Sequence, residues 1–339
     1  MARSSTDFAR LVASFLTDWL PHQRGYSENT VLGYRDAIRL LCSYLVEERG
    51  VGLESFHLAA LDRNLVVSWL GWLRDARGCT TSTANQRLAA VKSLASFAQL
   101  EHVELMAQMQ EVIAVRSTKS VPREVSYLTT DQVAALIDRP DAATRAGLRH
   151  RVALTLMYDT GCRVQELCDL DVRDVRTTRG AASARLVGKG RKARTVVISD
   201  ATASLVEGYV ERQRSGVSAD SPLVTNRVGG RMSRNGMRYI VSRYASLCHA
   251  DDPAFPERVH CHELRHSKAM HMLAAGINIV YIRDFLGHED ISTTMVYARA
   301  DNRLKDEAVG KLAPKLGADA DLPDWRDDGS LLDFLDSLG

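Results

Sequence analysis

The sequence predicts a mainly α-helical fold with a small antiparallel β-sheet (α+β), divided between two domains. Residues 1–115 contain several segments whose apolar side chains recur at helical spacing, which predicts a helical bundle. Residues 128–313 add more helical segments around short runs of β-branched residues, which predict strands. A basic, proline-containing stretch, 116–127, is predicted to link the two domains, and an acidic tail, 314–339, follows them.

The first domain is predicted to be a compact bundle of four or five helices. Apolar stripes at helical spacing lie in residues 8–20, 27–50, 62–73, 81–100 and 103–115. Residues 21–25, which begin with Pro21 and end with Gly25, are expected to break the first helix. Asp62 is expected to cap the third helix, and Gly78 to end it.

The second domain is predicted to combine helices with three short strands. Helices are expected in residues 129–137, 151–158, 164–167, 201–213, 235–250, 267–274, 278–286 and 302–312. Strands are expected in residues 170–175, 184–187 and 194–198, and residues 188–192 join the last two into a hairpin. Small polar residues from Ser292 predict another helix start, which places Tyr297 one turn into a short helix.

The composition is that of an ordinary soluble globular protein. Of the 339 residues, 45% are hydrophobic and 25% are charged. No apolar run approaches the roughly 18–20 residues that a membrane span needs. The six cysteines form no C-x-x-C pair, which indicates reduced thiols in a cytosolic protein.

The charge is distributed unevenly along the chain. The formal net charge is +2, but the last 26 residues hold two basic and seven acidic side chains. The rest of the chain therefore carries 42 basic and 35 acidic side chains, a net charge of +7. Such a moderately basic body is consistent with a phosphate-rich partner, although many other enzymes carry a similar charge.

The stretch that ends at Tyr297 concentrates side chains able to do chemistry. It contains H-E-L-R-H from His262, L-G-H ending at His288, and S-T-T-M-V-Y ending at Tyr297. Upstream, Arg163 lies in T-G-C-R-V-Q-E-L and Lys189 lies in G-K-G-R-K, between two glycines that let the backbone bend towards a ligand. This combination of residue types indicates a functional site.

Arg, Lys, His-x-x-Arg, His and Tyr in this order resemble the tyrosine recombinases, also called phage-type integrases. That family includes chromosome-dimer resolvases and transposon-encoded tyrosine transposases. The motif-bearing similarity runs over residues 129–311, and a weaker N-terminal similarity extends it over most of the chain. The resemblance implies a SAM-like, core-binding N-terminal domain and an integrase-type catalytic domain. It also implies a site-specific recombinase, for integration, excision, resolution or transposition, that acts through a 3′-phosphotyrosyl intermediate.

Within this resemblance, the residue types suit phosphoryl transfer. A tyrosine can attack a phosphodiester and keep the bond energy as an ester, so Tyr297 is the candidate nucleophile and no ATP is required. Arg163 and Arg265 are candidates for binding the non-bridging oxygens, because their charge is permanent and their donors are bidentate. Glu166 is assigned a supporting role, and the plain alternative is that it only pairs with Arg163. Since side chains supply the cations, no metal or cofactor is expected.

The proton transfers have candidates of their own. Lys189 is the candidate general acid for the leaving 5′ oxygen. His262 is the candidate base for the phenol, and His288 is expected to donate a hydrogen bond to the phosphate. His266 is expected to be a structural histidine.

Thirteen further side chains are candidates for DNA contact, and for each of them the alternative is a solvated polar surface. They are Ser27, Thr30, Asn85, Arg87, Lys92, Lys119, Arg191, Lys192, Arg194, Arg231, Arg234, Arg238 and Arg243. The first five lie on predicted helices of the first domain, the next one in the linker, and the following three at the hairpin. The last four are expected near one another, around the helix that this family inserts into the major groove.

Three other functions compete with this interpretation. H-E-L-R-H from His262 matches the zinc-protease pattern, with Glu263 as base and Glu289 as a third ligand. Its longer form fails, since Ala269 and Met272 replace a glycine and a histidine, and zinc leaves the other motif residues unexplained. A type IB topoisomerase has a similar constellation, but the compact helical first domain and the L-G-H to Tyr block favour a recombinase. A DNA-binding protein without catalysis would not need the complete constellation.

The partner implied by the resemblance is double-stranded DNA with recombination core sites. A homo-tetramer is expected on two duplexes, possibly with a paralogous recombinase, and a monomer or dimer in the free protein. Neither a membrane nor a cofactor is expected, and the location is expected to be the cytoplasm, at the nucleoid. The tail, residues 314–339, contains the apolar sequence S-L-L-D-F-L-D-S-L, which is too short to be a stable helix alone and is expected to dock on a partner or on its own chain.

Overall fold

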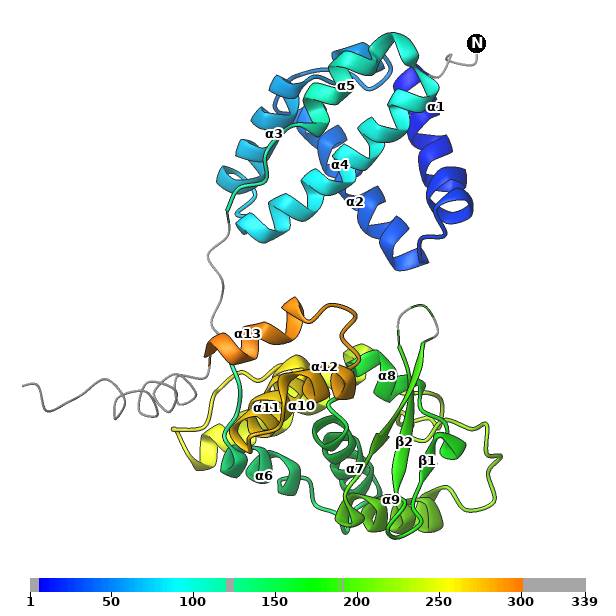
Figure 1. The fold of residues 1–339 in the computed structure, drawn as a ribbon, viewed down its shortest axis with the longest axis vertical. Coiled ribbons are helices and arrows are strands. Elements are labelled where there is room, and N and C mark those ends of the chain that lie inside the picture. The colour runs from blue at the N-terminus through cyan, green and yellow to red at the C-terminus, as the bar shows by residue number, and fades with distance from the viewer. Residues whose placement is uncertain (1–5, 120–124, 189, 191, 301–339) are drawn as a thin grey trace, which may run out of the picture. The chain divides into compact units, whose positions relative to one another are not determined.

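The computed structural model describes residues 6–119, 125–188, 190 and 192–300. They belong to two compact units, Met1–Arg123 and Glu124–Gly339, whose division falls within the expected linker (Figure 1). No helix in the described part of the chain is long and apolar enough to cross a bilayer. All six cysteines are described, and none of them is in a disulfide.

The N-terminal unit is a helical bundle. Its helices are α1 (Asp7–Ser14), the π-helix Phe15–Gln23, α2 (Glu28–Glu47), the 3₁₀ turn Leu58–Ala60, α3 (Arg63–Asp75), α4 (Thr81–Glu101), the 3₁₀ turn Val103–Leu105 and α5 (Met106–Ile113). Helix α4 packs against α2, α3 and α5, which is possible because alanines such as Ala90, Ala95 and Ala98 let neighbouring helices approach closely. Trp69 and Phe15 are fully buried in the core that results.

The first helix ends within residues 21–25, as expected, but it ends at Gln23, two residues beyond Pro21. Helix α1 continues as the π-helix, which contains Pro21. Its wider turn is visible where the Arg24 N–H donates to the carbonyl of Trp19, five residues earlier, at 2.9 Å. Burial of Phe15 and Trp19, whose rings stack at 5.4 Å, stabilises the π-helical segment before Pro21.

The C-terminal unit contains eight α-helices among its described residues. They are α6 (Thr130–Asp138), α7 (Arg145–Asp159), α8 (Val164–Asp169), α9 (Asp200–Gln213), α10 (Arg234–Asp251), α11 (Cys261–Ala274), α12 (Ile279–Leu286) and α13 (Ser292–Ala300). Helix α6 begins with the capping box of Thr129 and Gln132, as its sequence predicts. Helix α11 begins earlier than expected, so the whole H-E-L-R-H motif is helical. The expected helix 302–312 and the tail lie outside the described residues.

The sheet has three antiparallel strands in the order β1-β2-β3, namely β1 (Val175–Arg176), β2 (Ser183–Val187) and β3 (Ala193–Val197). Strands β2 and β3 form the expected hairpin, in which Leu186 is opposite Arg194. The expected strand 170–175 is wrong, since Val172–Asp174 is a 3₁₀ turn and only Val175 of that range is in a strand. Asp171 and Asp174 cap this turn reciprocally, and such local side-chain bonds compete with a strand ladder.

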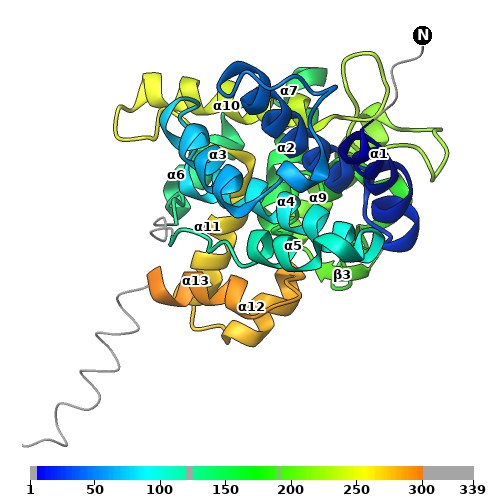
Figure 2. The same ribbon diagram turned by 90° about the horizontal axis from the view of Figure 1, so that it is seen from above.

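The last three described helices of the C-terminal unit pack against one another. Figure 2 shows α12 and α13 side by side, and both contact α11. A small apolar cluster that includes Leu286, Ile282 and Tyr297 lies between them. The fold class is therefore confirmed as mainly α with a small antiparallel sheet. The described motif residues gather where the start of α8 meets α11, α12 and α13.

Candidate functional site

Arg163 is placed by a sharp turn between α7 and α8. Gly161, at φ +56°, ends α7, and a Cβ atom there would lie 2.9 Å from Leu286 Cδ2. Only glycine fits both the backbone conformation and this close approach. Arg163 follows as the N-cap of α8, as the sequence predicts. The turn thus brings the start of α8 next to the end of α12.

Glu166 holds Arg163 and Arg194 together. Its Oε1 accepts from Arg163 Nη1 at 3.0 Å, and its Oε2 accepts from the Arg163 backbone N–H at 2.8 Å. Arg194, on β3, donates to the same two oxygens at 3.0 and 2.8 Å. Burial alone would raise the pKa of Glu166, but the hydrogen bonds from Arg194 and Arg163 outweigh it and lower that pKa. Glu166 is 3% exposed, so this charged network is internal.

The structure explains why the middle residue of L-G-H, Gly287, is a glycine. Gly287 ends α12 in the left-handed conformation, at φ +66°, and a Cβ atom there would lie 3.0 Å from the Arg194 side chain. Its carbonyl accepts from Arg163 Nη2 at 3.3 Å. The preceding carbonyl, of Leu286, accepts from Arg265 Nη2 at 2.8 Å. Two arginines from different helices therefore meet on consecutive carbonyls of one turn.

Arg265 is the more deeply buried of these two arginines. It is 1% exposed, and its Nη1 donates to the carbonyl of Gly161 at 2.7 Å. Burial, with the Arg163 charge next to it, lowers the pKa of Arg265 to about 10, so the side chain is still protonated at neutral pH. Both hydrogen bonds of the Arg265 guanidinium go to backbone carbonyls and neither goes to a carboxylate, so they do not neutralise its positive charge.

Tyr297 is buried, with 2% of its surface exposed. Its Oη lies 2.8 Å from Nδ1 of His266, and its ring stacks 6.5 Å from the ring of His288. Burial raises the pKa of the Tyr297 phenol, against the opposing charges of Arg265 and Arg163. Burial also lowers the pKa of His266 to about 4, helped by His262 and Arg265. The imidazole is therefore neutral at pH 7 and the phenol is protonated.

This contact differs from the arrangement that we expected of the two histidines. We expected His262 next to the phenol and His266 in a structural role, but it is His266 that makes the hydrogen bond to Tyr297. His262 is one helical turn earlier, with its ring 4.8 Å from the ring of His266. His262 is an exposed residue. The part of its ring that is buried, together with the charges of Arg265 and Arg163, lowers the pKa of His262. Sequence spacing could not separate the two, because residues four apart share one helix face.

His288 is oriented by the S-T-T motif that follows it. Its Nδ1 lies 2.8 Å from Oγ1 of Thr294, whose side chain is fully buried. Burial, with the charges of Arg265 and Arg163, lowers the pKa of His288 to about 4. With Nδ1 engaged by Thr294, the Nε2 edge is the part of the ring left for a ligand.

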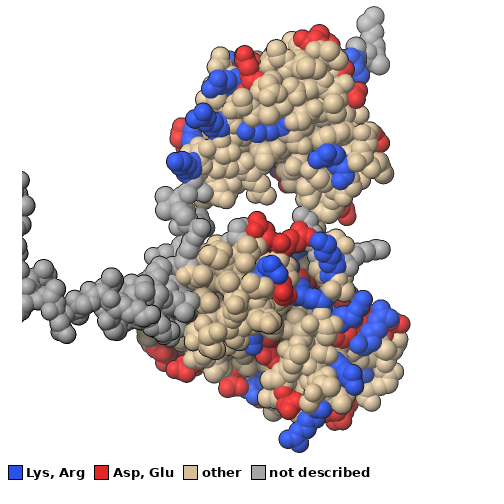
Figure 3. Space-filling model, viewed as in Figure 1, with Lys and Arg blue, Asp and Glu red and all other residues tan. Residues whose placement is uncertain are grey.

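An open cleft of about 630 Å³ lies beside these residues. Arg163 and His288 line it, together with Lys192, whose Nζ pairs with Glu289 at 2.8 Å. Lys189 and Arg191, which lie between β2 and β3 in the sequence, are outside the described residues. On the face in Figure 3, Lys and Arg side chains, interspersed with acidic ones, gather over the part of the C-terminal unit that contains the strands.

Two of the DNA-contact candidates of the C-terminal unit have partners within the protein. Arg194 also lines the cleft, and in this arrangement Glu166 and the carbonyl of Phe285 engage its guanidinium. Arg231 pairs with Asp171 at 2.6 Å.

Arg234 and Arg238 are one turn apart on α10, whereas Arg243 lies about 180° around the helix from Arg234 at 100° per residue. The expected cluster of four arginines is therefore not formed.

In the N-terminal unit, several candidates have structural partners. Ser27 caps α2 and its hydroxyl lies 2.9 Å from that of Thr30. Asn85 exchanges two hydrogen bonds with the backbone of Thr118, and Arg87 Nη1 donates to Cys79 Sγ at 2.6 Å.

The remaining two candidates of this unit, Lys92 on α4 and Lys119, are half-buried and exposed, respectively.

The zinc motif has no metal-binding geometry among the described residues. No group of three or more His, Cys, Asp or Glu side chains there is arranged to hold an ion. His266 instead bonds Tyr297, and Arg265 of the same motif bonds the carbonyls of Gly161 and Leu286. These contacts connect the H-E-L-R-H segment to Tyr297 and to the turn before Arg163.

The fold and the site together define a class of protein. A helical bundle is followed by a mainly helical unit in which two arginines, a histidine and a buried tyrosine converge beside a cleft. This is the constellation of tyrosine recombinases, enzymes that cleave and rejoin DNA strands in site-specific recombination.

The chain belongs to the phage integrase family. The phage integrase family model matches residues 126–303, and the model of the phage integrase N-terminal SAM-like domain matches residues 13–102. A Sinorhizobium fredii protein described as an integrase/recombinase, y4rC, is 31% identical over 97% of this chain and 98% of its own length. Tyrosine recombinase XerD of Staphylococcus epidermidis is 31% identical over 81% of this chain and 89% of its own length.

Solved structures share the fold. XerH site-specific recombinase bound to a palindromic difH substrate, in a post-cleavage complex, matches with a TM-score of 0.70 at 17% identity, over 91% of each chain. The Tn1549 transposon integrase, in complex with transposon right end DNA, matches with a TM-score of 0.68 at 16% identity, over 89% of this chain and 98% of that chain. The topoisomerase and protease alternatives are not favoured by these relatives.

Proposed function

We propose that Tyr297 attacks a DNA phosphate held by Arg163 and Arg265. The observation that supports this is the meeting of these two arginines on the consecutive carbonyls of Leu286 and Gly287. The turn aligns two permanent charges from different helices before any DNA binds. Preorganised donors of this kind stabilise the negative charge that develops on the non-bridging oxygens.

The reaction balances without an external energy source. The Tyr297 oxygen forms a bond to phosphorus while the bond from phosphorus to the 5′ oxygen breaks, and the leaving oxygen takes a proton. The 3′-phosphotyrosyl ester keeps the energy of the broken bond. Attack by the 5′ hydroxyl of another strand then releases Tyr297 and completes the exchange. Arg163 serves both steps, because the same phosphate remains bound.

His266 is the group proposed to take the phenol proton. Its pKa of about 4 and the raised pKa of Tyr297 keep the proton on the phenol in the resting enzyme. Transfer becomes favourable only as the phenol oxygen bonds to phosphorus. Because Tyr297 is 2% exposed, attack on a phosphate in the cleft also requires α13 to move.

Lys189 and His288 complete the proposed machinery. Lys189 lies outside the described residues, and its position in the sequence between Gly188 and Lys192, which both line the cleft, supports a role as general acid for the 5′ oxygen. His288 is proposed to donate from Nε2 to the phosphate, since Thr294 engages its Nδ1.

The partner is proposed to be double-stranded DNA carrying recombination core sites, bound in the cytoplasm at the nucleoid. Support comes from the solved relatives, which include recombinases bound to DNA. We propose a homo-tetramer on two duplexes, possibly with a paralogous recombinase, assembled from a free monomer or dimer. The biological outcome, whether integration, resolution or transposition, depends on which sites the enzyme joins.

The test uses Tyr297→Phe and a nicked substrate that traps the covalent intermediate. The variant keeps the buried ring and loses only the hydroxyl, so it should bind DNA normally and form no adduct on a denaturing gel. EDTA is present throughout, because side chains are proposed to supply every cation. An adduct in the phenylalanine variant, or loss of wild-type cleavage in EDTA with recovery on adding zinc, would overturn the mechanism.

A further inference from the structure

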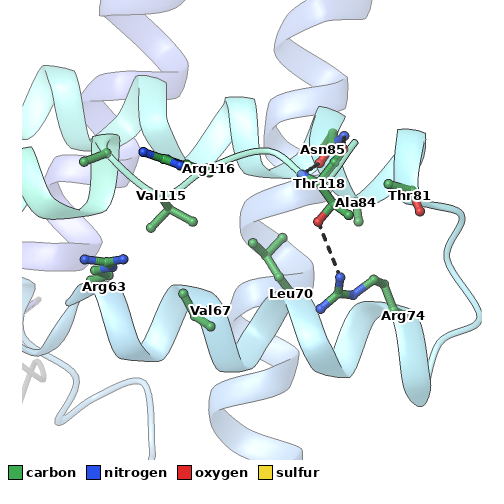
Figure 4. Close-up of a pocket in the computed structure, with 11 residues that line it drawn as sticks. Arg63, Val67, Leu70, Arg74, Thr81, Ala84, Asn85, Val115, Arg116 and Thr118 are labelled. Atoms are coloured by element: carbon green, nitrogen blue, oxygen red, sulfur yellow. Dashed lines mark hydrogen bonds between the residues drawn. The ribbon is translucent and has the colours of Figure 1, made fainter. Parts of the chain in front are cut away.

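A separate pocket lies within the N-terminal unit, between α3, the start of α4 and residues 114–118 (Figure 4). Its volume is about 240 Å³, below the roughly 300–1,000 Å³ of small-molecule sites. A pocket of this size suits one or two anchoring side chains of a docked segment. The proposed reaction uses none of the residues that line it.

The rim of this pocket is positively charged. Arg63 and Arg74 extend from α3, Arg116 extends from the segment after α5, and no acidic side chain lines the pocket. Arg74 donates to Oγ1 of Thr118 at 3.4 Å. Neither Arg63 nor Arg116 has a salt bridge within the described part of the chain. The rim therefore has cationic groups available for an anionic partner.

The pocket also has an apolar floor. Figure 4 shows Val67 and Leu70 on α3 between Arg63 and Arg74, with Val115 across from them. Val67 is 48% exposed, which is a large fraction for a valine on a packed helix. Such a floor would gain from burial under apolar side chains, which a phosphate cannot supply.

The far wall of the pocket is preformed. Asn85 donates from Nδ2 to the carbonyl of Thr118 at 2.8 Å and accepts from its N–H at 3.1 Å. This pair fixes the segment that carries Arg116 against α4. A docking segment would therefore not have to order the wall, which lowers the entropic cost of binding.

We propose that this pocket binds residues 330–339 of this protein, S-L-L-D-F-L-D-S-L-G. The segment contains five large apolar side chains and two aspartates, Asp333 and Asp336, and further aspartates precede it. It thus complements both the apolar floor and the cationic rim. Residues 301–329 separate it from α13, and an extended chain of this length spans up to roughly 100 Å, so it can reach the pocket of its own chain or of a second copy.

The first experiment replaces Phe334 in the full chain by the photoreactive p-benzoylphenylalanine, without DNA. After irradiation, mass spectrometry should find cross-links on α3 and on residues 114–118. Mixing heavy-isotope and normal chains tells whether the segment comes from the same chain or from a second copy. Cross-links confined to the C-terminal unit, or none at all, would sink the proposal.

The second experiment tests the charge complementarity. Arg63→Glu with Arg116→Glu should lower the cross-link yield by roughly tenfold, because attractive contacts become repulsive. Adding Asp333→Arg and Asp336→Arg should restore it. Arg39→Glu with Arg49→Glu is the matched control, since these arginines are exposed in the same unit and do not line the pocket. Thermal unfolding checks that each variant is folded.

The same variants give a different result if the pocket binds the DNA backbone instead of the tail. If the double glutamate variant loses DNA affinity while its cross-link yield is unchanged, the pocket binds the DNA backbone and the proposal is wrong. Because both experiments read cross-links in the absence of DNA, a failed recombination mechanism would leave their outcome unaffected.

Discussion

At the scale of single residues, His266 could either position the Tyr297 phenol or accept its proton, and variants of His266 can tell these two roles apart. In His266→Asn, the side-chain oxygen can still accept from the phenol near the position of Nδ1, but it cannot take the proton. In His266→Ala, both functions are lost. If His266 is the proton acceptor, both variants should cleave slower by roughly 10²–10⁴.

His262→Asn and His262→Ala are the matched controls, one turn away on α11 and without a contact to the phenol. Single-turnover cleavage of the nicked substrate gives the rates. Near-normal cleavage by His266→Asn, together with slow cleavage by His266→Ala, would reduce His266 to a positioning residue.

The prediction for Lys189 depends on the leaving group. Lys189→Ala should cleave ordinary DNA slower by roughly 10²–10⁴, because the 5′ oxygen then leaves without a proton. A substrate with sulfur at that 5′ position needs little protonation and should recover much of the rate. Equal losses on both substrates would mean that Lys189 positions DNA instead of donating a proton.

At the scale of elements, Arg194 connects the hairpin to the N-terminus of α8 through Glu166. Its forked guanidinium bonds both oxygens of that carboxylate, and lysine cannot reproduce this geometry. Arg194→Lys should therefore misplace Arg163 and slow cleavage by roughly 10–100-fold, in line with the loss of alignment in a preorganised site. DNA affinity should change little, because Glu166 and the carbonyl of Phe285 already engage the guanidinium of Arg194.

Arg185→Lys, on the neighbouring strand β2, is the matched control, since that side chain is 57% exposed and pairs with Asp174 away from Glu166. Unfolding midpoints would detect a general loss of stability. A fall in DNA affinity as large as the fall in cleavage rate would contradict the positioning role of Arg194.

At the scale of the whole molecule, the acidic tail is expected to act on assembly. Deleting residues 318–339 removes the apolar segment and its aspartates, so single-site DNA binding should stay intact or become tighter. Synapsis and recombination should weaken, because the segment that docks is gone. Native-gel titration shows the assemblies, and a strand-exchange assay shows the activity. Tetramers that form and recombine at the full rate after the deletion would disprove this role.

The sequence by itself determined the helical bundle, the β2–β3 hairpin and the identity of the motif residues. Periodic apolar residues, caps such as Thr129 and the glycine at 287 are local signals, since they depend on neighbours a few positions away. The sequence could also predict Arg163 and its pairing with Glu166, because the two residues are only three positions apart.

Only the tertiary structure decided which histidine bonds Tyr297, what Arg194 does, and why the π-helix contains Pro21. His262 and His266 share one helix face, so the choice between them depends on where α13 packs against α11. Arg194 reaches Glu166 across 28 positions of sequence, and nothing in its own neighbourhood distinguishes it from an exposed hairpin arginine. Long-range packing determines such contacts, and local sequence patterns do not encode it.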